Sequence, residues 1–174
     1  MFAMKDETMP RAFLNYAREY CEAANILLDA YTTKNRELFN PIYMLYFHAT
    51  ELALKAFLRQ KGFKTEDLKR QQLRHNLSAL HDKCVEEEPG FDALVSSNEL
   101  NLRNITELLD SGNKDYAFRY WTPNSRSIAR IDWVKKTVNE LIKYMDKCIP
   151  MNKTPGKAGS PLLILSEPQP KKSV

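Results

Sequence analysis

The spacing of apolar residues constrains the fold of this chain more than any other feature of its sequence. Apolar side chains recur at intervals of three and four positions through most of residues 10–148, and this is the period of an amphipathic helix. No stretch shows the alternation of apolar and polar residues that is typical of a half-buried strand. The sequence therefore predicts an all-α fold, a bundle of helices.

Glycine and proline mark the junctions between the expected helices. Three of the five glycines lie before residue 150, and each follows the end of an expected helix. Asn40 followed by Pro41 has the pattern of an N-cap residue and a first helical residue, and either His75 or Asn76 opens a later helix. The longer helices are expected at about residues 10–31, 40–60, 75–88, 98–110 and 125–148, with a short helix from Thr65 and Gly112 just beyond the fourth.

The composition of the chain changes after residue 149. Five of the nine prolines and two of the five glycines lie in residues 150–170. We therefore expect residues 1–149 to form the helical bundle and residues 150–174 to be a flexible Pro/Lys-rich tail. The apolar run Pro161–Leu165 either docks on the body or on a partner as an extended strand, or has no role.

Charges are segregated along the body of the chain. The formal net charge of the chain is +4, and little of it belongs to the body, which is unlike a domain dedicated to coating nucleic acid. Residues 59–74 hold six basic and two acidic side chains, residues 82–110 hold two and eight, and residues 113–137 hold six and two. This pattern has three interpretations: ordinary solvated helix faces, a surface for self-association, or a face that attracts phosphate.

Several classes of protein are excluded by composition. Three cysteines without a CxxC spacing predict neither a disulfide framework nor a zinc ribbon, and they favour the cytoplasm. No apolar run approaches the roughly 18 residues that span a bilayer, and the first residues lack a secretory signal pattern, so no membrane association is expected. His81 and Cys84 would share a helix face, but a metal needs three or four ligands. We expect no metal site and no cofactor.

The second expected helix carries a narrow strip of ionisable residues on an otherwise apolar circumference, which predicts that it is the central helix of the bundle. The strip consists of His48, Glu51, Lys55 and Arg59. One interpretation is that it is the wet side of the helix, with an ion pair between residues four apart. The other is that it forms a proton-transfer or anion-binding site beside His75.

Two further clusters contain residues suited to phosphate or nucleobase chemistry. Arg70 and His75 have an Arg-x4-His spacing, so that Arg70, Arg74 and His75 are candidate catalytic residues for a phosphodiester. Arg119 and Tyr120 stand among aromatic residues before the last helix, where they either stack a base or plug one end of the bundle. The candidate ligand-binding residues are His48, Glu51, Lys55, Arg59, His75, Asn76, Arg119 and Tyr120.

Two segments resemble the HEPN superfamily. Tyr46–Leu58 contains its Glu-x3-Lys-Ala helix pattern, Arg74–Leu80 contains its Arg-His-x-Leu-x2-Leu helix start, and the Arg119–Tyr120 pair is similar to an Arg-Tyr element of some branches. The resemblance implies a four- to five-helix up-down bundle, usually a homodimer, in prokaryotic defence or toxin–antitoxin systems. It also implies cleavage of RNA or association with RNA or nucleotides, often beside a nucleotidyltransferase partner.

The chain lacks the Arg-x4-6-His motif that catalytic members of this superfamily carry in a late helix, because the last histidine is His81. The sequence therefore predicts a dimeric module that engages RNA, a nucleotide or a protein partner through a polar groove, without nuclease activity. One alternative is a metal-independent, toxin-like ribonuclease that uses Arg70, Arg74 and His75. Another is a structural helical interaction protein.

Overall fold

The computed structural model of the chain describes residues 9–34, 38–95, 101–119 and 128–150, and the regular secondary structure in these ranges is helical, with no strand. The all-α class is thereby confirmed. The elements are α1 (Pro10–Lys34), α2 (Phe39–Gln60), α3 (Thr65–Leu68), α4 (Leu77–Glu87), α5 (Phe91–Val95), α6 (Leu102–Gly112), the 3-10 helix η2 (Lys114–Tyr116) and α7 (Ile131–Cys148). Beyond Pro150, the expected tail lies outside the described residues.

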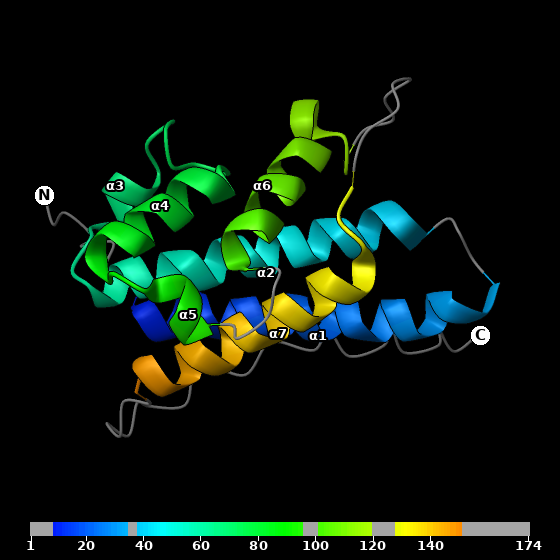
Figure 1. Cartoon of the computed structure of the whole chain (residues 1–174), viewed down its shortest axis with the longest axis horizontal. Coiled ribbons are helices and arrows are strands. Elements are labelled where there is room, and N and C mark those ends of the chain that lie inside the picture. Colours follow the sequence, from blue (N-terminus) through cyan, green and yellow to red (C-terminus); the bar gives the residue numbers. More distant parts are fainter. Residues whose placement is uncertain (1–8, 35–37, 96–100, 120–127, 151–174) are drawn as a thin grey trace, which may run out of the picture.

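Helix α2 lies at the centre of the molecule, as its apolar circumference predicts. Thirteen of its 22 residues are buried. It packs against α1 and α7 on one side and against α4 and α6 on the other (Figure 1). Helix α1 runs antiparallel to α2 and α7, and the three lie along the long axis of the molecule. Among the described helices, none is both long and apolar enough to cross a membrane.

Polar contacts tie the ends of α1 and α7 together around this core. The Arg11 guanidinium contacts Asp146 at 3.0 Å and also donates to the carbonyl of Ile149 at 3.0 Å. In the interior, the fully buried Tyr46 donates its hydroxyl to Asn25 Oδ1 at 2.7 Å. The buried hydroxyl therefore has a hydrogen-bond partner inside the protein, in place of the water that would bind it in the unfolded chain.

Several predicted helix boundaries were wrong. Helix α2 is preceded by Leu38 in place of an Asn40 cap, although Pro41 still stands in the first turn, where its missing N–H costs no hydrogen bond. Gly112 is the last residue of α6 rather than the residue after it. Helix α7 begins at Ile131, later than expected, and the buried Tyr43 hydroxyl donates to the carbonyl of Ala129 just before it.

The start of α4 is defined as the sequence predicts, by Asn76. The Asn76 side chain accepts from the backbone N–H of Ala79 at 2.9 Å. Asp110, on α6, accepts from the backbone N–H of Leu77 at 3.0 Å and of Ser78 at 2.7 Å. These bonds satisfy the first free N–H groups of α4 and join it to α6, which positions the preceding loop over α2.

Candidate functional site

A buried carboxylate on α2 is the centre of the candidate site. Glu51 is 3% exposed, and its Oε1 lies 2.5 Å from Lys55 Nζ. Its Oε2 lies 3.0 Å from His75 Nδ1 and 3.7 Å from His48 Nδ1. Lys55 is also buried. The interpretation of this strip as the wet side of α2 was therefore wrong for Glu51 and Lys55, which are buried, although the expected ion pair between them is present.

The charges around Glu51 keep it ionised. Burial by itself would raise the pKa of this carboxyl, but the contacts with His48, Lys55 and His75 outweigh burial and lower the pKa to about 2. An ionised carboxylate only accepts hydrogen bonds. His75 Nδ1 therefore carries the proton in this contact, and Nε2 is the ring nitrogen that remains for a ligand.

His75 has an unusual backbone conformation. Its φ of 58° lies in the left-handed region, as do those of Asp115 (56°) and Tyr116 (58°). This conformation costs an L residue other than glycine roughly 1–2 kcal/mol. The bond to Glu51 and the capped start of α4 hold His75 there. Strained residues gather at functional sites, and both His75 and Tyr116 line the same cavity.

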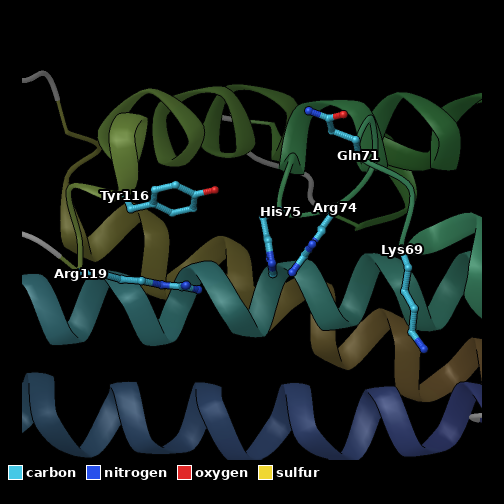
Figure 2. Close-up of a pocket in the computed structure, with 6 residues that line it drawn as sticks. All are labelled: Lys69, Gln71, Arg74, His75, Tyr116 and Arg119. Atoms are coloured by element: carbon cyan, nitrogen blue, oxygen red, sulfur yellow. The ribbon is translucent and has the colours of Figure 1, made fainter.

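A cavity of about 580 Å³ opens beside this cluster. It lies within the size range of small-molecule sites, about 300–1,000 Å³. Figure 2 shows His75 and Arg74 reaching from the α3–α4 loop towards α2, with Tyr116 and Arg119 on one side of them and Lys69 on the other. Within the described parts of the chain, no carboxylate lines the cavity. Its lining residues are Lys69, Gln71, Arg74, His75, Tyr116 and Arg119.

Arg119 connects the cavity to the strip on α2. Its Nη2 lies 3.3 Å from His48 Nε2, and its guanidinium carbon lies 5.8 Å from the centre of the Tyr116 ring. A guanidinium only donates, so His48 Nε2 is the acceptor in this contact. The structure thus brings Arg119 to His48, 71 positions away along the chain. Its predicted companion Tyr120 lies outside the described residues.

Three other candidate residues support the site without lining the cavity. Lys55 is directed to Glu51, and Asn76 caps α4. The Arg59 guanidinium donates to the carbonyl of Phe63 at the end of α2. These contacts hold the helix and the loop that frame the cavity.

Arg70, a candidate catalytic residue, points away from His75. Its guanidinium pairs with Asp67 at 2.8 Å, and its side chain is 70% exposed. It lines a second cavity of about 450 Å³, between the α3–α4 loop and α4. The structure therefore brings Arg74 and His75 together and leaves Arg70 outside this group.

Sequence reasoning missed three of the lining residues. Lys69 belongs to the basic stretch of residues 59–74, and the positive charge of this stretch could have been used to predict that Lys69 lies at the site. Gln71 and Tyr116 had no comparable signal. The position of the Tyr116 ring depends on its left-handed conformation, which no residue type in this turn predicts.

The pair His81 and Cys84 is part of the interior of the molecule. His81 Nε2 lies 2.8 Å from Asp92, and Cys84 is fully buried, with Sγ 3.8 Å from the Leu54 carbonyl oxygen. Burial raises the pKa of the Cys84 thiol, which disfavours the thiolate that binds metals. No group of three potential metal ligands occurs in the described ranges.

Comparisons of the chain with protein-family models, with curated proteins and with solved structures found no match.

Proposed function

We propose that this chain is a HEPN-like, non-catalytic binding module and that its cavity binds a phosphate group of RNA or of a nucleotide. One observation carries the proposal. Lys69, Arg74 and Arg119 line a cavity that no carboxylate lines in the described part of the chain. Cations that line a concave site attract and orient phosphate, and arginine offers two parallel donors to it.

The charge balance beneath the cavity supports a net attraction for anions. Glu51 and Lys55 form a buried pair whose charges cancel at close range. Glu51 is therefore paired with Lys55 rather than with the arginines of the cavity wall. His75 contributes a neutral ring when unprotonated and a further positive charge when protonated.

Arg74 is the residue to change in a first test, because its side chain is exposed and lines the cavity. Binding of a fluorescein-labelled single-stranded oligoribonucleotide is measured by fluorescence anisotropy over a series of salt concentrations. We expect binding to weaken as salt increases. Arg74→Glu is expected to abolish it, with no change in the thermal unfolding midpoint.

Lys143→Glu is the matched control, since it makes the same type of charge reversal at an exposed position on α7, which contributes nothing to the cavity. Reversal at Lys55 is unsuitable, because it would place two carboxylates together in the interior. Equal losses of binding in Arg74→Glu and Lys143→Glu would contradict the proposal. So would the absence of binding by the wild type across RNA and nucleotide probes.

A second function, metal-independent RNA cleavage, is favoured by the 3.0 Å contact between Glu51 and His75. A carboxylate that orients an imidazole is the arrangement used in general acid–base catalysis, and Arg74 lies beside the ring to receive a phosphate. Cleavage in the presence of EDTA that is lost in His75→Ala would favour this function. Intact RNA after prolonged incubation with the wild type would refute cleavage, and phosphate binding would remain the proposed function.

We also propose that the chain forms a homodimer. The segregated charges support self-association. So do Tyr16 and Tyr20, which are 57% and 37% exposed on α1. Sedimentation velocity at tens of micromolar tests this, and a monomer at that concentration would refute it. By the HEPN resemblance, a nucleotidyltransferase-type protein is the expected partner, and a defence or toxin–antitoxin system is the expected setting.

A further inference from the structure

Tyr116 is an aromatic residue that the hydrophobic core does not use. Its side chain is 52% exposed, yet it lines the cavity, whose other five lining residues are all polar or charged. An exposed tyrosine in a positive cavity offers a flat apolar face beside the groups that would hold a phosphate. That combination is more specific than a site for a simple inorganic anion.

The turn that carries Tyr116 is held in place by backbone bonds. The N–H of Tyr116 donates to the carbonyl of Asn113 at 2.9 Å, and the N–H of Arg119 donates to the carbonyl of Tyr116 at 2.8 Å. The turn thereby keeps Tyr116 in its left-handed conformation and sets Arg119 beside its ring. The backbone that carries the ring is therefore held in place before any ligand arrives.

The cavity has an aromatic side and a cationic side. In Figure 2, Tyr116 lies with Arg119 to one side of His75 and Arg74, and Lys69 lies beyond them on the other side. A nucleotide has the matching layout, with a flat base at one end and a phosphate at the other. Stacking on tyrosine, with arginine near the ring, is a recurring way of holding an unpaired base.

We infer that the cavity accepts a complete nucleotide unit, with its base stacked on Tyr116 and its phosphate at Arg74. This inference rests on the proposed function, because it assumes that the cavity binds phosphate. It adds that the site recognises the base. The nucleotide unit belongs either to a free mononucleotide or to a single-stranded RNA, and both present the same chemistry to the cavity.

An aromatic–arginine pair on a protein surface does not by itself indicate a ligand. On α7, Trp133 is 37% exposed, and the Arg130 guanidinium lies 4.8 Å from its ring centre, yet neither residue lines this cavity. This second pair has the same local chemistry without the adjacent cationic cavity. It therefore provides a matched control for the role of Tyr116.

The test compares ligands with and without a base by isothermal titration calorimetry. The ligands are AMP, ribose 5-phosphate and a short oligoadenylate. The variants are Tyr116→Leu, which removes the ring, Tyr116→Phe, which keeps it, and the control Trp133→Leu. We expect the wild type to bind AMP about tenfold more tightly than ribose 5-phosphate. Tyr116→Leu is expected to lose this difference, whereas Tyr116→Phe and Trp133→Leu keep it.

The outcomes separate this inference from the function on which it rests. Equal affinity of the wild type for AMP and ribose 5-phosphate, or unchanged AMP affinity in Tyr116→Leu, overturns base stacking and leaves phosphate binding standing. No binding of any of the three ligands overturns both. Tighter binding of oligoadenylate than of AMP supports the inference with RNA as the source, and the reverse order supports it with a free nucleotide. If a Tyr116 variant fails to fold, the comparison of AMP with ribose 5-phosphate in the wild type still tests whether the cavity recognises the base.

Discussion

Replacement of Glu51 by glutamine removes the charge around which the candidate site is built. Lys55 then remains buried without its partner, and the loss of one member of a buried pair costs about 3–5 kcal/mol. The pKa of the same carboxylate gives a second figure. Its fall from 4.5 to about 2 on folding, at about 1.4 kcal/mol per pH unit, corresponds to about 3 kcal/mol. We therefore expect Glu51→Gln to lower the free energy of unfolding by at least about 3 kcal/mol at pH 7.

The same reasoning predicts the pH dependence. Because the pKa of Glu51 is lower in the folded state, its stabilising contribution is complete above pH 4.5 and is lost as the pH falls through about 2. Other carboxylates also titrate in this range, but they do so in both proteins. Between pH 5 and pH 2 the wild type is thus expected to lose about 3 kcal/mol more than Glu51→Gln.

Urea unfolding followed by circular dichroism measures these free energies at each pH. The double variant Glu51→Gln with Lys55→Met is the internal check. Removal of both charges leaves no unpaired ammonium in the interior, so the double variant should recover part of the stability lost by Glu51→Gln alone. Parallel pH profiles for the wild type and Glu51→Gln would refute the account of this pair.

Three further expectations concern the fold. Asp110→Ala should lower the free energy of unfolding by about 1–2 kcal/mol, because Asp110 accepts hydrogen bonds from the first N–H groups of α4. Urea unfolding at pH 7 measures this change, and an unchanged midpoint would contradict it. A chain that ends at Pro150 should keep its melting temperature, because Arg11 already anchors the end of α7; a fall of about ten degrees in calorimetry would place the apolar tail segment in the core. Among the thiols, Cys148 should react first with a disulfide reagent, because burial shields Cys21 and Cys84 and raises their pKa values. Rapid labelling of Cys84 in the folded protein would refute this.

The central position of α2 was predictable from its sequence, because a helix that is apolar over most of its circumference must be surrounded by other helices. The start of α4 was predictable for a similarly local reason, since the side chain of Asn76 reaches a backbone N–H only three residues ahead. The start of α7 was not, because no side-chain cap marks it: its N-cap residue, Arg130, makes no capping hydrogen bond.

The features of the candidate site also fall into two groups, those that the sequence determines and those that depend on the tertiary structure. Sequence alone determined that Glu51 and Lys55 lie one helical turn apart and that Arg74 and His75 stand beside the start of a helix, because these relations depend on helical geometry over a few residues. Only the tertiary structure decided that Glu51 is buried, that Arg70 is directed away from His75, and that Arg119 and Tyr116 complete the cavity. Each of these features depends on how the α3–α4 loop and the turn after α6 pack over α2. Contacts between segments that are distant along the chain produce no repeating pattern in the sequence, so sequence analysis could not predict them.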